Sequence, residues 1–224
     1  MTVRRLTTIA IGAMLALALV PAGGAVARTA DDATLHVVHG IPKVKVDVCV
    51  NGAEVKSNFR YGRTFSATLP ESTYRIKVKA AAPGDCVGPA LIDTKAELTA
   101  GLNATAVARF MKGEPGLDVF VNDVSPTDGG EARLTVRHTA KAPKVDVWAN
   151  GTTILTDVPR GATADLEVPE GIYAAWVSAT DDFAPVIGPA VLSLEEGMAY
   201  QVHAVGTKAS NYRFVVLAQG VGTA

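Results

Sequence analysis

The chain has 224 residues, of which 48% are hydrophobic, and it carries 21 basic against 22 acidic side chains. This length allows one large or two small globular domains. The near-neutral balance and the absence of a basic run exclude nucleic acid as the expected partner.

Residues 1–27 have the features of a secretory signal peptide. Arg4 and Arg5 precede an uncharged run at 6–20, and Ala25 and Ala27 occupy the −3 and −1 positions of a cleavage site. This run is too short to span a bilayer comfortably, and no second apolar run follows it. We therefore expect a secreted, extracellular protein without a membrane span, either free or associated with the cell wall. Without these residues the chain has 19 basic and 22 acidic side chains.

Cys49 and Cys86 are the two cysteines of the chain. Because disulfides persist in exported proteins, we expect these two residues to be bonded to each other. Closing a loop of this size stabilises a fold by about 4 kcal/mol in the chain-entropy model.

The chain repeats itself after 99 residues. The segment "VDVCVNG" (46–52) returns as "VDVWANG" (145–151), and His39 aligns with His138. A period of this length corresponds to a whole domain rather than to a short repeat unit. Between the copies lies a segment rich in turn-forming residues, which predicts a linker. The expected organisation is a signal peptide at 1–27, domains at 28–123 and 132–224, and a linker at 124–131.

Each copy is expected to consist of β-strands. In the first copy, valines at alternate positions of 44–50 predict a strand with one buried face, and "TYRIKVK" (73–79) alternates in the same way. Asn51-Gly52 fits a tight hairpin turn, in which both residues have positive φ. About seven short strands per copy, separated by Gly, Pro and Asn, predict an antiparallel β-sandwich.

The repeated motifs also resemble a known family. The segments "VVHGIPKVKVDVCVNG" with "LPESTYRIKV", and "VRHTAKAPKVDVWANG" with "VPEGIYAAWV", are similar to the domain of unknown function 4397. The resemblance covers nearly all of the chain after residue 27, twice. It implies an exported bacterial protein, all-β in class, with two tandem immunoglobulin-like or transthyretin-like antiparallel β-sandwich domains. It implies no established activity.

Both tryptophans lie in the second copy. Trp148 replaces Cys49, and Trp176 replaces Lys77 of the first copy. Strand parity places them on the face opposite the valines. One interpretation is that Phe183 and its neighbours pack on Trp148 in place of the disulfide. A second is that the two indoles form a ligand-binding platform, and a third is that this face docks on the first copy.

A histidine and an aspartate recur at the same spacing, as His39 with Asp47 and as His138 with Asp146. Such pairs could ligate a metal or act in acid–base catalysis. A zinc site needs further ligands, however, and the remaining histidines are not repeated. We favour a structural role for these pairs, so no metal or cofactor is expected.

No nucleophile motif or phosphate-binding loop is present. We therefore expect a protein that is not an enzyme, acting as a binding or adhesion-like module on an unidentified envelope glycan or protein. Two alternatives stay open. One is a metal-dependent enzyme that uses the His/Asp pairs, and the other is a structural envelope protein that self-associates.

Overall fold

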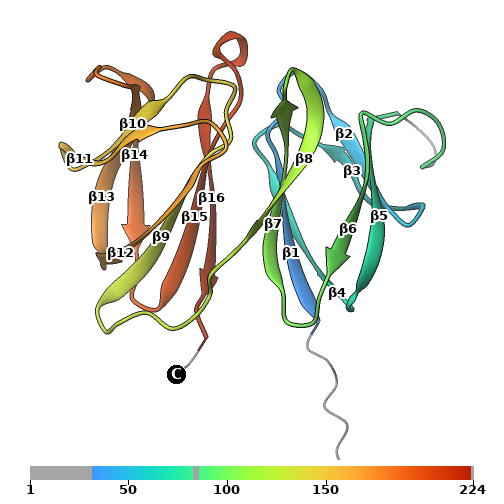
Figure 1. Ribbon diagram of the computed structural model, residues 1–224, viewed down its shortest axis with the longest axis horizontal. Helices are drawn as coiled ribbons and strands as arrows, with labels where there is room; N and C mark the ends of the chain where they lie inside the picture. Colours follow the sequence, from blue (N-terminus) through green and yellow to red (C-terminus); the bar gives the residue numbers. More distant parts are fainter. Residues whose placement is uncertain (1–31, 83–85, 223–224) are drawn as a thin grey trace, which may run out of the picture.

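The computed structural model describes residues 32–82 and 86–222, so the predicted signal peptide lies outside the described residues. Apart from a 3-10 turn at Lys208–Ser210, the regular structure of these residues is all β-strand, which confirms the expected fold class. The strands form two units of eight (Figure 1). The first unit contains β1 (Ala33–His39), β2 (Val46–Val50), β3 (Ala53–Phe59), β4 (Thr64–Leu69), β5 (Ser72–Ala80), β6 (Ile92–Leu98), β7 (Asn103–Met111) and β8 (Glu114–Val121). The second contains β9 (Glu131–His138), β10 (Val145–Ala149), β11 (Thr152–Val158), β12 (Thr163–Pro169), β13 (Gly171–Ala179), β14 (Pro185–Leu194), β15 (Met198–Val205) and β16 (Arg213–Gly220).

Each unit is a sandwich of two four-stranded sheets. The first unit has the sheets β4-β1-β7-β8 and β3-β2-β5-β6, and the second has β12-β9-β15-β16 and β11-β10-β13-β14. Strand pairing among the described residues is antiparallel except for β1 with β7 and β9 with β15, which are parallel. Each parallel pair arises because the chain forms two strands of the other sheet, β5 and β6 or β13 and β14, before β7 or β15 pairs with the first strand of its unit.

The alternation of the sequence predicts the core. Val46 and Val48 of β2 lie in the core of the first unit, while Cys49 lies on the opposite face of the strand. Both Asn-Gly turns have the positive φ angles that the sequence predicts, with Asn51 at 49° and Asn150 at 50°.

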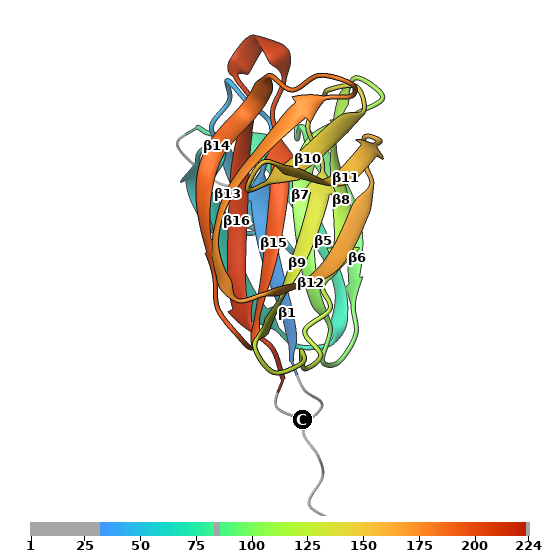
Figure 2. The same ribbon diagram turned by 90° about the vertical axis from the view of Figure 1, so that its left-hand side faces the viewer.

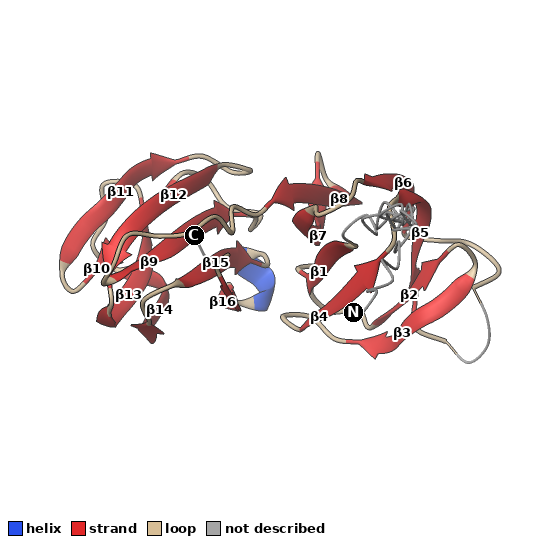
Figure 3. Cartoon of the chain, turned by 90° about the horizontal axis from the view of Figure 1, so that it is seen from below, coloured by secondary structure: helices blue, strands red, loops and turns tan. Residues whose placement is uncertain are grey.

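The two units pack against each other through one sheet each. Figure 3, which looks along the strands, shows the sheet of β1 and β7 facing the sheet of β9 and β15. Val38, Val107, Val205 and Val215 form a buried apolar cluster across this contact. The central strands are consequently buried on both faces, as in β15, where seven of eight residues are buried. The molecule therefore has four layers of sheet.

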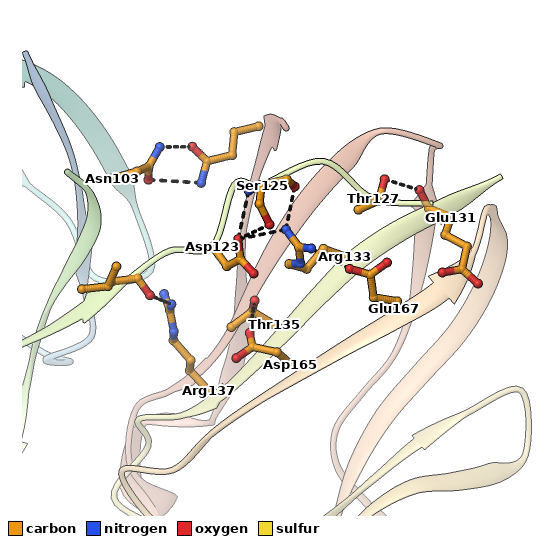
Figure 4. A network of polar contacts seen from close by, with 12 residues as sticks. Asn103, Asp123, Ser125, Thr127, Glu131, Arg133, Thr135, Arg137, Asp165 and Glu167 are labelled. Carbon is orange, nitrogen blue, oxygen red and sulfur yellow. Dashed lines mark hydrogen bonds and ion pairs between the residues drawn. The ribbon is translucent and has the colours of Figure 1, made fainter. Parts of the chain in front are cut away.

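Arg137 of β9 is the largest side chain buried at this contact, at 1% exposure. Its guanidinium donates to the Val121 carbonyl at 3.0 Å (Figure 4). It also donates to the Asn122 side-chain oxygen at 2.8 Å and lies over the Phe120 ring. Both acceptors and the ring belong to β8 or to the residue after it. The equivalent residue of the first unit is Val38, so the contact is asymmetric. Arg137 thus ties the second unit to the last strand of the first.

An amide network extends the contact beyond the valine cluster. The side-chain oxygen of Gln219 in β16 accepts hydrogen bonds from Asn103 at 2.8 Å and from His36 at 3.1 Å. The side-chain amide of Gln219 donates in turn to Gln201 at 3.1 Å. Buried polar groups that satisfy one another across a contact fix its register. The two units therefore have a defined relative position.

The segment between β8 and β9 is held in place by Arg133. The Arg133 side chain is nearly buried, and it donates to the Ser125 carbonyl at 2.8 Å and pairs with Glu167 at 2.6 Å (Figure 4). Asp123 lies 3.1 Å from the same guanidinium. The residues predicted as a linker are thus attached to the second unit rather than free.

We expect acid to destabilise the protein through His203 of β15. Burial, and then the charges of Arg137 and His36, lower the pKa of His203 to about 3. An unfolded chain binds this proton near pH 6.5. Protonation of His203 therefore costs no stability above pH 6.5, and the folded state loses stability as the pH falls from 6.5 towards 3. Between pH 7 and pH 4.5 the loss due to His203 is about 3 kcal/mol.

Urea unfolding at pH 7 and pH 4.5 measures this loss, with His203→Leu as the comparison. The variant lacks the titrating group and should retain more of its stability at pH 4.5 than the wild type. Other histidines contribute equally to both proteins and cancel in the difference. Equal losses in the two proteins would show that His203 is not the responsible group.

Candidate functional site

The repeated histidines bind the backbone of their own loops. The Nε2 atom of His39 donates to the Val44 carbonyl at 3.1 Å, and that of His138 donates to the Pro143 carbonyl at 2.8 Å. Both side chains are buried, and burial lowers the pKa of each. Each histidine is therefore neutral near pH 7 and closes the loop that follows its strand.

The repeated aspartates also bind backbone groups. The two carboxylate oxygens of Asp47 accept from the amides of Asn58 at 2.8 Å and Ala82 at 3.1 Å. Asp146 accepts from Asp157 at 2.8 Å and from Asp181 at 3.3 Å. In each unit the first of these amides belongs to a residue with positive φ, next to an irregularity in strand pairing. The aspartate thus holds a bulge in place.

Two further repeated residues act in the same way. The Tyr74 hydroxyl donates to the Pro70 carbonyl and the Tyr173 hydroxyl to the Pro169 carbonyl, both at 2.8 Å. Such a tyrosine ties a strand to the corner that precedes it. The shared motifs of the two copies therefore maintain the fold, and the described residues contain no cluster of three or more potential metal ligands.

The outer faces of the two units differ. In the first unit the predicted disulfide between Cys49 and Cys86 is confirmed. Beside it Arg75 forms an ion pair with Asp93 at 2.7 Å, so this face is charged. In the second unit, Trp148 and Trp176 are directly paired across β10 and β13.

The tryptophans form a compact cluster with Phe183. The two indoles are stacked with centroids 5.6 Å apart and an interplanar angle of 2°, and Phe183 meets them edge-on at 4.9 and 5.6 Å. The Trp148 indole nitrogen donates to Ser178 at 2.9 Å. The predicted packing of Phe183 on Trp148 is therefore confirmed. Trp176 is 9% exposed, whereas Phe183 is 62% exposed.

The interpretation that the tryptophans dock on the first unit is wrong. They lie on the sheet β11-β10-β13-β14, whereas the contact between the units is made by β12-β9-β15-β16. Figure 2, in which the second unit faces the viewer, shows β10, β13 and β14 across the front.

Two aliphatic residues that the sequence analysis did not single out extend this cluster. Ile172 is 72% exposed and Val191 is 75% exposed. Ile172 and Trp176 lie on one face of β13 because they are four residues apart, and Val191 lies opposite Ala174 on that face. We call the set Trp148, Ile172, Ala174, Trp176, Phe183 and Val191 the outer patch. Strand parity in "GIYAAWV" could have identified Ile172.

Small cavities occur inside both sandwiches. They have volumes of about 50 and 60 Å³ and are lined almost entirely by apolar core residues. Such volumes hold at most one or two water-sized molecules. The cores therefore offer no room for a cofactor, and the candidate site is the outer patch.

Removing a repeated aspartate should destabilise the fold without affecting metal content. Asp146→Ala leaves two backbone amides without their acceptor, which we expect to cost about 2 kcal/mol, and Asp47→Ala should behave alike. Thermal melting and metal analysis of the purified proteins measure both quantities. Stoichiometric zinc or copper in the wild type, lost on His138→Ala, would instead support a metal site.

Breaking the disulfide should cost about 4 kcal/mol, because it closes a loop of 37 residues. Denaturant unfolding of Cys49→Ala/Cys86→Ala against the oxidised wild type measures the difference. Alkylation of the wild type without reductant should leave its mass unchanged, and a mass increase would reveal free thiols.

Comparison with known proteins places the chain in a family. A family model described as "Domain of unknown function (DUF4397)" matches residues 33–147, from β1 into β10. None of the curated proteins matches the chain. Among solved structures, the Bacillus anthracis TIE protein aligns at 13% identity and a TM-score of 0.24, over 82% of this chain and 34% of that one. This chain thus spans well under half the length of that protein. The family model covers more than half of the chain, which therefore belongs to the DUF4397 family.

Proposed function

We propose that the protein is an extracellular, non-catalytic binding module that contacts a partner protein through the outer patch. The observation that carries the proposal is the exposure of Ile172, Phe183 and Val191 on one sheet face. Contiguous exposed apolar side chains are typical of contact surfaces. Aromatic residues buried at the centre of such a surface supply much of the binding energy.

Comparison of the two units supports a specific role for this face. Lys95 of the first unit occupies the position of Val191, and Arg75 occupies that of Ala174. The same fold is thus stable with a charged outer face. The apolar side chains of the second unit are not required by the sandwich itself, and an interaction outside the unit accounts for them.

The geometry favours a protein over a glycan as the partner. A sugar ring stacks on an exposed indole face and needs polar groups around it. Here the faces of Trp148 and Trp176 lie against each other, and Phe183 covers their edges. The exposed part of the outer patch consists of two aliphatic side chains and one phenyl ring, and such a surface complements the apolar side chains of a partner protein.

The disulfide and the predicted signal peptide support an extracellular site of action. None of the helices in the described part of the chain could cross a membrane. A contact with an envelope protein would therefore hold the module at the cell surface.

Binding of the labelled protein to an envelope fraction of the producing cells tests this proposal. We expect saturable binding that is abolished when the fraction is treated with protease. The variant Ile172→Thr/Val191→Lys carries the first unit's residues on the outer patch and should bind at least about 10-fold more weakly, since each lost apolar contact is worth about 1–2 kcal/mol.

The matched control is Val55→Thr/Val216→Lys, which makes similar changes at two exposed valines outside the outer patch. It should bind like the wild type. Unchanged binding of the patch variant would refute the proposal. Binding that resists protease but disappears after glycosidase treatment would identify a glycan partner instead.

A further inference from the structure

The loops at the two ends of the molecule carry opposite charges. β1, β7, β9 and β15 finish at the upper end in Figure 1, and the loops there are predominantly basic. Their basic residues are Lys43, Lys45, Arg60, Arg63, Lys112, Lys141, Lys144, Arg160 and Lys208, against the described acids Asp181 and Asp182. The described loops at the lower end contain acidic residues and no basic ones. These acids are Asp32, Glu71, Asp123, Asp128, Glu170, Glu195 and Glu196.

The net charge of −1 does not show this separation of basic and acidic loops, because the two kinds of charge cancel in the sum. Because like charges gather at each end, the field near the upper end is positive although the whole chain is almost neutral. The upper end therefore attracts anions independently of the outer patch.

A cleft between the two units lies at this upper end. It encloses about 440 Å³ and is lined by Pro42, Lys43 and Phe110 of the first unit and by Lys141, Thr207, Lys208 and Ala209 of the second. We call it the basic cleft. No carboxylate is among these lining residues. Lys43, Lys141 and Lys208 are exposed, and none of them has an ion-pair partner among the described residues.

The cleft is held in shape by contacts across the unit boundary. The Lys141 ammonium lies 5.6 Å from the centre of the Phe110 ring, and the Arg160 guanidinium donates to the Phe110 carbonyl. Within the second unit, an isolated backbone bridge pairs Lys141 with Thr207. Three ammonium groups from three separate loops are thus placed around one opening.

A second groove continues from the basic cleft. It encloses about 430 Å³, shares Lys208 with the cleft and adds Lys144. The Lys144 ammonium lies 3.7 Å from Asp157, so that this lysine is partly neutralised. Together the two depressions form a track in which positive charges follow one another.

We propose that the basic cleft binds an extended polyanion with closely spaced phosphate groups. Lysine ammonium groups act as point charges that bind phosphate oxygens without demanding one geometry, which suits a repeating chain. A track of lysines gains affinity from each phosphate it neutralises.

Two other anionic partners fit less well. Single-stranded nucleic acid binding relies on exposed rings on which bases stack, and the Phe110 ring of the cleft lies under Lys141. An anionic membrane presents a flat array of headgroups, whereas the lysines here follow two connected depressions. The shape and composition of the basic cleft therefore favour a flexible phosphate polymer.

Fluorescence anisotropy with labelled inorganic polyphosphate tests the proposal, with anionic phospholipid vesicles as a second probe. We expect the purified protein to bind polyphosphate, with affinity falling as salt is raised from 50 to 200 mM. Lys43→Ala/Lys141→Ala/Lys208→Ala should weaken binding at least 10-fold. It should also reduce the log–log salt slope by about 2, since three phosphate contacts are lost.

The matched control is Lys56→Ala/Lys77→Ala/Lys95→Ala on the outer sheet of the first unit, which removes the same charge. It should change the affinity less than about 2-fold, because these lysines lie outside the basic cleft. Equal weakening by both triple variants would show unspecific attraction and overturn the proposal. No binding of polyphosphate by the wild type, or binding to vesicles alone, would also overturn it. Melting temperatures of all variants confirm that each is folded.

Discussion

The structure depends on the contact between its two inner sheets. Val38, Val107, Val205 and Val215 exclude water from this contact, and Arg137 crosses it to reach β8. An arginine buried to this extent is tolerated because its charge lies over an aromatic ring and its two terminal nitrogens donate to oxygen acceptors. The contact turns two sandwiches into one four-layered body. It also leaves the outer sheet faces and the loop ends as the surfaces available for function.

Comparison of the two units separates residues that fold the chain from residues that distinguish its surfaces. The histidine, aspartate and tyrosine shared by the copies each bind a backbone group of their own unit. They give no unit a chemistry that the other lacks. Two exchanges, by contrast, lie on faces directed away from the sandwich cores. Val38 becomes Arg137 at the contact, and Lys77 becomes Trp176 on the outer sheet. These two exchanges therefore give the two units different surfaces on the same fold.

The sequence predicted what depends on local pattern. Alternating valines, the Asn-Gly turns and the cysteine pair are local or covalent signals, and the structure confirms all three. The contact between the units could not be predicted in this way, because parity assigns a residue to a face without saying what covers that face. Arg137 and His203 have polar side chains, yet both are buried, and both contact residues of β8 in the first unit. Strand parity correctly placed the tryptophans on the face opposite the valines. The first unit, however, covers the sheet β12-β9-β15-β16 and not the sheet that carries the tryptophans. The charge separation emerges only when the topology brings loops distant in sequence to one end.

The position of the basic cleft links its chemistry to the contact between the units. Lys43 and Phe110 come from the first unit, whereas Lys141 and Lys208 come from the second, so the cleft keeps its shape only while the units stay docked. His203 lies within that contact, and its protonation in acid opposes docking. Acid would thus weaken the contact that holds the lysines together, whereas each sandwich has a core of its own. The outer patch belongs to a single unit and does not depend on docking. It follows that the two surfaces should respond differently to acid, with anion binding lost first and apolar contacts retained.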